Sequence, residues 1–257
     1  MIRKNKVKKM LKEGEVAIGS FVKLTDPSST EIMGLAGLDF FVLDSEHVAI
    51  NKETMANIIR ASDISEITPI IRVSENSATD VMQALDAGAL GVHIPNVDTF
   101  EEAKYAVKST RYTPKGNRGF APTHRAAGYG LIDKFEYIKM ANEETLTILH
   151  CETIEAANNL DQILSLEELD VIFIGPMDLS QSLGADIMGK SNDPELLKVI
   201  DEIITRVNAT GKVVGTVAAD VEMAKDLMSK GVRYIPISSD QGMISKMCKE
   251  IVQKVKV

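Results

Sequence analysis

Eight short apolar segments, rich in β-branched residues, recur along the 257-residue chain and alternate with segments of helical pattern. They span residues 16–24, 39–46, 67–73, 91–97, 146–152, 170–178, 212–219 and 233–239. Near-continuous apolar runs of this length are typical of strands that are buried on both faces of a parallel sheet. No GxGxxG or GxxxxGKS/T motif follows the first segment. The alternation therefore predicts a single (β/α)8 TIM barrel over residues 1–257 rather than a doubly wound sheet.

The charge balance limits the classes of partner. The chain has 29 Lys and Arg against 37 Asp and Glu, a formal net charge of −8, which argues against nonspecific binding to nucleic acid or to an anionic membrane. Cys151 and Cys248 form neither a disulfide framework nor a zinc spacing, so we expect a cytoplasmic protein. Residues 1–15 are basic but lack the apolar core of a signal peptide. We predict that they form an amphipathic helix at the bottom of the barrel.

Polar side chains collect where four of the predicted strands end. They are Asp44, Glu46 and His47 after the second strand, Arg72 on the third, His150 and Glu152 on the fifth, and Asp178 on the sixth. In a (β/α)8 barrel the chemistry lies at the carboxyl ends of the strands. We therefore expect all of these side chains at one rim.

Glu152 and Asp178 come from neighbouring strands, where two carboxylates repel each other unless a cation or a proton lies between them. Carboxylate oxygens suit Mg²⁺ or Mn²⁺. Alternatively, each carboxylate caps the helix that follows it. Because side chains alternate along a strand, His150 shares a face with Glu152, whereas Cys151 points outward and packs against a helix.

Arg72 has two possible roles. Its guanidinium can hold an anionic oxygen of a ligand, or it can pair with Asp44 or Glu46. His47 follows these two acids, which could orient it and raise its basicity for acid/base work. A lone histidine in this position would more often be a satisfied core residue.

One connection, residues 110–145, is unusually long for a compact domain, and long loops are often functional. Its Arg118, His124 and Arg125 could recognise an acidic tail of a substrate, or they could belong to a solvated surface loop. For His124, and for His93 in the middle of the fourth strand, we favour a structural role.

Six stretches together resemble the HpcH/HpaI aldolase family, the metal-dependent pyruvate aldolases. They are GLDFFVLDSEH, PIIRV, ALDAGALGVHIPNVDTFEEA, RYTPKGNRG, ETIEAANNLDQIL and DVIFIGPMDLSQSLG, and they follow the family's order from about residue 17 to 240. The resemblance implies a class II aldolase that reversibly cleaves a 4-hydroxy-2-oxo acid to pyruvate and an aldehyde. It also implies a divalent ion (Mg²⁺, Mn²⁺ or Co²⁺) and a homohexamer, a trimer of dimers, in which the last helix packs on a neighbouring subunit.

The same resemblance assigns roles to individual residues. Glu152 and Asp178 would bind the metal. Arg72 would hold the keto oxygen and stabilise the enolate that forms from it. His47 would act as the acid/base on the hydroxyl of the aldehyde half, through a water, and Asp86 would support that histidine.

Further residues of the expected substrate site depart from the family's pattern. The backbone at Gly175 and Met177 would meet the pyruvate carboxylate, but the family usually has a small residue where Met177 stands. His150 replaces a substrate-contacting glutamine, and Val48 replaces a glycine. A larger Met177 should reshape the mouth of the pocket. His150 could donate a hydrogen bond as glutamine does, or it could ligate the metal and so favour Co²⁺ or Zn²⁺.

Three other functions stay open at this stage. A Schiff-base aldolase needs a lysine inside the barrel, and Lys23 in the first predicted strand is the candidate that we consider. An acyl-CoA lyase of the citrate lyase β-chain type shares the barrel and the paired acids. A non-catalytic barrel is the third, since Val48, Met177 and His150 all depart from the family's pattern.

Overall fold

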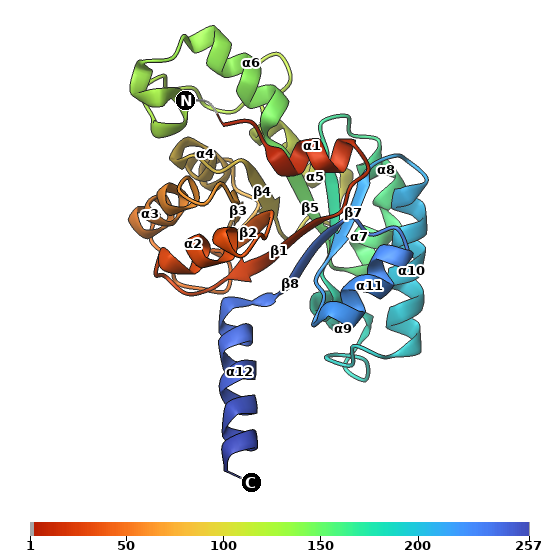
Figure 1. Cartoon of the computed structure of the whole chain (residues 1–257). Helices are drawn as coiled ribbons and strands as arrows, with labels where there is room; N and C mark the ends of the chain where they lie inside the picture. Colours follow the sequence, from red (N-terminus) through yellow and green to blue (C-terminus); the bar gives the residue numbers. More distant parts are fainter. Residues whose placement is uncertain (1–2, 257) are drawn as a thin grey trace.

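The computed structural model describes residues 3–256, in which eight parallel strands form one closed barrel (Figure 1). Met1, Ile2 and Val257 belong to the predicted domain but lie outside the described residues. The strands are β1 (Ala17–Val22), β2 (Phe40–Asp44), β3 (Thr68–Arg72), β4 (Gly91–Ile94), β5 (Leu146–Cys151), β6 (Val171–Ile174), β7 (Val213–Thr216) and β8 (Tyr234–Ser239). Each strand pairs with the next along the chain, and β8 pairs with β1. The predicted (β/α)8 barrel is therefore confirmed.

The alternation of side chains along the strands divides the apolar residues into two clusters. Phe40, Val42, Ile70, Ile148 and Phe173 point into the barrel, whereas Phe41, Leu43, Ile71, Leu149 and Ile172 face the surrounding helices. Asp44, Arg72 and His150 lie at the ends of their strands, two residues after inward-facing apolar residues, so they also point into the barrel. Registration places Asp44 beside Arg72, and Arg72 beside His93 on β4. The inward-facing side chains are thus apolar within the barrel and polar at its carboxyl rim.

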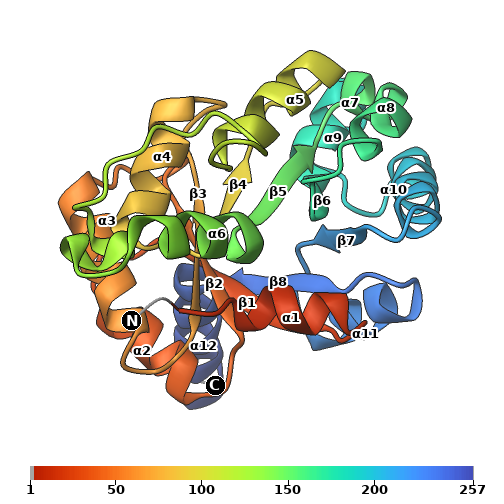
Figure 2. The same cartoon turned by 90° about the horizontal axis from the view of Figure 1, so that it is seen from above.

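Helices surround the barrel, as Figure 2 shows from above. Those before the long connection are α1 (Lys6–Lys12), α2 (Ser28–Leu35), α3 (Lys52–Ser62), α4 (Ala78–Ala87) and α5 (Phe100–Ser109). The others are η1 (Arg125–Gly130), α6 (Lys134–Glu144), α7 (Ile154–Asn158), α8 (Leu160–Leu164), α9 (Pro176–Leu183), α10 (Pro194–Asn208), α11 (Val221–Ser229) and α12 (Asp240–Val255). No helix within residues 3–256 is both long and apolar enough to span a bilayer.

Helix α1 closes the amino-terminal end of the barrel, as the sequence predicts. Its Val7 and Leu11 pack into the same buried cluster as Ala17 and Phe40 of the barrel interior. Residues 110–145 lie at this end too, with α6 beside α1 in Figure 1. Asn5 ties the two together, because its side-chain amide donates to the backbone carbonyl of Glu144. The long connection therefore covers the end of the barrel opposite the carboxyl rim.

Helix α12 leaves the opposite end of the barrel and projects away from it (Figure 1). Of its residues only Asp240 is buried, where its carboxylate accepts hydrogen bonds from the backbone of Lys23 and Leu24. The large apolar side chains exposed on this helix are Met243, Ile244, Met247, Ile251, Val252 and Val255. The chain itself thus leaves a long apolar helix face uncovered.

Candidate active site

A cavity of ≈310 Å³ opens at the carboxyl ends of the strands. The predicted site residues that line it are His47, Arg72, His150, Glu152, Gly175, Met177 and Asp178. Lys23, the lysine considered for Schiff-base chemistry, lines it as well. The fold thus brings together every predicted site residue except Asp86.

Glu152 is buried at the end of β5, and both of its carboxylate oxygens are held in place. Its Oε2 lies 2.8 Å from His150 Nδ1, and its Oε1 accepts a 2.8 Å hydrogen bond from the backbone N–H of Asn96. Asn96 has a positive φ of 56°, a conformation that asparagine tolerates better than most residues. Burial alone would raise the pKa of Glu152, but these contacts outweigh it and lower the pKa to about 2. Glu152 is therefore ionised at neutral pH.

Asp178 approaches Glu152 across Gly175. The predicted sixth strand ends early, because Pro176 opens α9 and places Asp178 in the first turn of that helix. A methyl group on Gly175 would lie 3.1 Å from Glu152 Oε2 and 3.7 Å from Asp178 Oδ2. Both carboxylates therefore face one point, which stays open because residue 175 has no side chain.

The alternative in which the two acids cap helices does not fit this geometry. Thr153, not Glu152, caps α7, because its hydroxyl accepts from the backbone N–H of Ala156. The amino terminus of α9 has no side-chain cap. Within residues 3–256 no group of three or more His, Cys, Asp and Glu side chains could by itself hold a metal ion. Two convergent carboxylates nevertheless fit Mg²⁺ or Mn²⁺, which commonly complete their coordination with water and substrate oxygens.

Arg72 pairs with both acids that the sequence offered as partners. Its Nε and one terminal nitrogen donate to the two oxygens of Asp44 at 3.0 and 2.7 Å. The other terminal nitrogen lies 3.1 Å from Glu46 Oε2. Burial would raise the pKa of Asp44, but the hydrogen bonds and charge of Arg72 outweigh it and lower that pKa. The guanidinium, which also lies over the Phe21 ring, is thus fixed in one orientation at the cavity wall.

His47 and Lys23 stand at the outer part of the cavity. The His47 side chain is 56% exposed, and its Nε2 lies 3.8 Å from Glu46 Oε2. Lys23 Nζ lies 3.4 Å from Asp44 Oδ2. His47 is therefore open to a ligand and to water, whereas Lys23 forms an ion pair with a carboxylate.

Residues 17–246 match the HpcH/HpaI aldolase/citrate lyase family. The chain belongs to this family. It is 34% identical to the 5-keto-4-deoxy-D-glucarate aldolase of Shigella boydii serotype 18 over 252 residues, which cover 98% of this chain and 96% of that protein.

Solved structures of similar proteins have the same fold. One from Burkholderia cenocepacia superposes with a TM-score of 0.92 at 28% identity and covers 98% of this chain and 100% of that one. The citrate synthase SbnG superposes with a TM-score of 0.88 at 33% identity and covers 97% and 96% of the two chains. The predicted family and the predicted class, a carbon–carbon lyase, are confirmed, and an aldolase is favoured over an acyl-CoA lyase or a non-catalytic barrel.

Asp86 does not meet His47 within this HpcH/HpaI chain. It lies near the end of α4, which leads away from the carboxyl rim, and its Oδ1 lies 2.5 Å from a terminal nitrogen of Arg118 and 3.4 Å from His124 Nε2. Arg125 forms an ion pair with Asp63. Arg118, His124 and Arg125 thus pair with acids on α4 and after α3, and they do not line the cavity.

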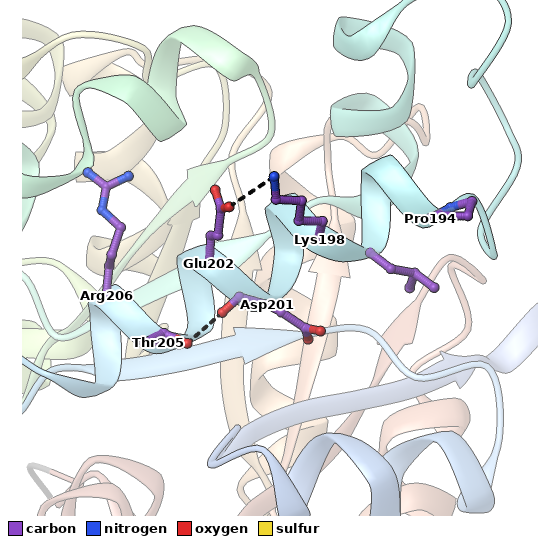
Figure 3. A pocket seen from close by; sticks show the side chains of 7 residues that line it. Pro194, Lys198, Asp201, Glu202, Thr205 and Arg206 are labelled. Atoms are coloured by element: carbon purple, nitrogen blue, oxygen red, sulfur yellow. Dashed lines mark hydrogen bonds and ion pairs between the residues drawn. The ribbon is translucent and has the colours of Figure 1, made fainter.

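A second hollow, of ≈730 Å³, lies along the outer face of α10 (Figure 3). Lys198 and Glu202 approach to 3.9 Å beside it, and the Thr205 hydroxyl donates to the backbone carbonyl of Asp201. Every residue that lines it belongs to α10, and none is a predicted site residue. This hollow is therefore a feature of the helix surface, separate from the HpcH/HpaI site.

Sequence reasoning missed several residues that line the cavity, such as Phe21 and Ser238, and three more that hold Glu152 and His150 in place. Asn96 supplies an N–H to Glu152, and His93 and Tyr234 extend the contacts of His150 into the barrel. His93 is fully buried and hydrogen-bonded, as its structural assignment predicts, but its partner lines the cavity. The sequence signal that identifies His93 as part of the site is its position on the inward-facing side of β4, beside Arg72 on β3. Cys151 is buried on the outer face of β5, and burial raises its pKa to about 12, which fits the predicted packing role.

Proposed function

We propose that the chain is a divalent-metal-dependent class II aldolase, which reversibly cleaves a 4-hydroxy-2-oxo acid to pyruvate and an aldehyde. The observation that carries this proposal is the convergence of Glu152 and Asp178 on one open point beside the fixed guanidinium of Arg72. Cleavage of the carbon–carbon bond leaves an enolate of pyruvate, so the site must stabilise negative charge as it develops. The guanidinium of Arg72 and a cation held by the two carboxylates would both stabilise this charge.

The proposed metal ligands are the carboxylates of Glu152 and Asp178. An Mg²⁺, Mn²⁺ or Co²⁺ ion held by them supplies Lewis-acid stabilisation of the negative charge on the 2-oxo acid. His150 contacts Glu152 through Nδ1 and His93 through Nε2, so both of its ring nitrogens are already engaged. We therefore assign His150 a supporting role beside the ligand Glu152 and not a role as a ligand.

Arg72 and the first turn of α9 bind the substrate. The guanidinium, held by Asp44 and Glu46, is proposed to hold the keto oxygen and to stabilise the enolate oxygen. The amino terminus of α9, with no side-chain cap, presents backbone groups at Gly175 and Met177 toward the same cavity. A helix amino terminus favours an anion, so we assign the pyruvate carboxylate to it.

His47 is proposed to move the proton of the 4-hydroxyl group, through a water, when the carbon–carbon bond breaks. Its exposed ring at the mouth of the cavity fits this role, because the aldehyde half extends outward from the bound 2-oxo acid. Support of His47 by Asp86 requires a second copy of the chain, since the two residues do not meet in one.

The substrate proposed is a 4-hydroxy-2-oxo acid derived from a sugar acid. The support is the 34% identity with a 5-keto-4-deoxy-D-glucarate aldolase over nearly the whole chain. Met177, which is 56% exposed at the cavity, is placed to contact the aldehyde half. Together with His150, it marks where this chain's specificity is expected to differ from that of its relatives.

Chelation is expected to abolish pyruvate release. Complete removal of divalent ions should lower the rate from 4-hydroxy-2-oxo acids by at least ~10³-fold, because loss of the Lewis acid removes several kcal/mol of charge stabilisation. Readdition of Mg²⁺, Mn²⁺ or Co²⁺ should restore it. A coupled assay for pyruvate measures both steps. Activity that survives full chelation, together with a borohydride-trapped pyruvate adduct on Lys23, would instead establish the Schiff-base alternative.

We also propose that the chain forms a hexamer, a trimer of dimers, in which α12 packs on a neighbouring subunit. The support is the apolar face that α12 exposes as it projects from the barrel. The double variant Met247→Glu with Ile251→Glu places two charges on that face and should lower the assembly's mass, measured by light scattering. Lys249→Glu with Gln253→Glu places charges on the opposite face and should leave the mass unchanged. An equal mass for both variants would contradict the proposal.

A further inference from the structure

Four polar side chains form a continuous chain of contacts from the carboxyl rim into the closed interior of the barrel. Glu152 Oε2 lies 2.8 Å from His150 Nδ1, and His150 Nε2 lies 3.0 Å from His93 Nδ1. His93 Nε2 in turn lies 2.8 Å from the hydroxyl of Tyr234. His93 and Tyr234 are fully buried, and His150 is 2% exposed. Polar groups this deeply buried are costly unless each is paired, so the contacts constrain one another.

These contacts fix the orientation of both histidine rings. The carboxylate of Glu152 only accepts, so His150 donates to it through Nδ1. The other ring nitrogen of His150, Nε2, contacts His93 Nδ1, and His93 Nε2 contacts the Tyr234 hydroxyl. Every ring nitrogen of the two histidines therefore has a partner, so neither ring can turn without leaving a buried polar atom unpaired.

We propose that Tyr234 and His93 are positioning residues, which fix the orientation of the His150 ring so that its Nδ1–H holds the carboxylate of Glu152 facing Asp178. Neither touches the substrate or the metal point, so both act through His150. The inference rests on the proposed role of Glu152 as a metal ligand. It also gives a reason for the histidine at position 150, since a glutamine there has no second nitrogen that could contact His93.

The far end of the chain matters because each ring is held in place by the next partner. Without the Tyr234 hydroxyl, His93 Nε2 is left unpaired inside the barrel, and the His93 ring can turn to find another partner. His150 then loses the contact at Nε2 that holds its ring against Glu152. Partners that orient a metal ligand in this way are typically worth ~10–100-fold in metal affinity or activity.

Tyr234→Phe tests the inference, because it removes only the hydroxyl. The readout is the Kd for Mn²⁺ alone, measured by electron paramagnetic resonance without substrate. We expect this Kd to rise about tenfold. Phe40→Leu is the matched control, since Phe40 stacks on Tyr234 at a centroid distance of 4.2 Å and lies outside the chain of contacts. Its Mn²⁺ affinity should stay within about twofold of the native value.

A second variant shows whether the effect passes through His150. In the His150→Gln background the amide can still donate to Glu152 without reference to His93, so adding Tyr234→Phe should change the Mn²⁺ affinity little. Nitrogen-15 NMR gives an independent readout, because the chain has only 4 histidines to assign. We expect the ring signals of His150 to shift in Tyr234→Phe together with those of His93. Unshifted His150 signals would overturn the coupling through His93.

The outcomes separate this inference from the proposed function. A native chain that binds no Mn²⁺ would contradict the function itself. Native binding with an unchanged Tyr234→Phe affinity would overturn only the positioning role. An equal loss of affinity in Tyr234→Phe and Phe40→Leu would also overturn it, because the effect would then come from packing.

Discussion

Glu152→Gln and Asp178→Asn are each expected to lower kcat for pyruvate release by at least ~10³-fold and to weaken Mn²⁺ binding severely. Each replacement keeps the size of the side chain and removes one of the two charges that face the open point beside Gly175. Loss of the cation removes several kcal/mol of stabilisation of the developing enolate, and each 1.4 kcal/mol corresponds to about a tenfold change in rate. Steady-state kinetics and a Mn²⁺ titration measure the two effects.

Matched variants control for the loss of a negative charge. Glu155→Gln removes an exposed carboxylate one helical turn beyond Glu152, and Asp186→Asn removes an exposed one beyond Asp178. Both should retain native kcat and Mn²⁺ affinity. Gly175→Ala keeps both acids but fills the space between them, and it should also lower Mn²⁺ affinity. Near-native turnover in Glu152→Gln would refute its assignment as a ligand.

Arg72→Lys should lower kcat by ~10²–10³-fold while KM changes much less. A lysine keeps the positive charge but cannot bind Asp44 at two points and still reach Glu46, so the charge no longer has a fixed position at the cavity wall. Loss of a preorganised donor to a developing oxyanion typically has a cost of this size. The kcat and KM values separate this effect from weaker ground-state binding.

Arg111→Lys controls for the structural part of the Arg72 effect. Arg111 is also buried and paired with two acids, Glu168 and Asp170, but it does not line the cavity. The substitution should lower the free energy of unfolding by a few kcal/mol and leave kcat near its native value. A similar loss of kcat in both variants would assign Arg72 a structural role only.

Much of the site follows from the sequence, because strand ends in a parallel barrel must meet at one rim. Asp44, Arg72, His150 and Glu152 each end an apolar run, and the alternation of side chains fixes which of them share a face. The apolar pattern predicts Asp178 at the end of a strand, but Pro176 turns the chain into a helix before it. That error left Asp178 at the same rim, so the expected pairing with Glu152 was unaffected.

Other features depend on information that a single sequence does not carry. Asp86 matches a family motif, but α4 leads it away from His47, and a helix position alone does not show which copy of the chain supplies a contact. The contact of His93 with Tyr234 joins residues 141 positions apart and depends on the registration of strands within the closed barrel. Asn96 acts through a backbone N–H, which the identity of a side chain does not reveal.

Exchange of the methyl protons of pyruvate for deuterium is a direct test of the proposed enolate chemistry, because it requires an enolate but no knowledge of the aldehyde. Proton NMR of pyruvate in D₂O with the native chain and Mg²⁺ is the measurement. We expect exchange well above the uncatalysed rate, lost after chelation and lost in Asp178→Asn. Exchange at the uncatalysed rate with metal present, or undiminished exchange in Asp178→Asn, would refute a metal-dependent aldolase.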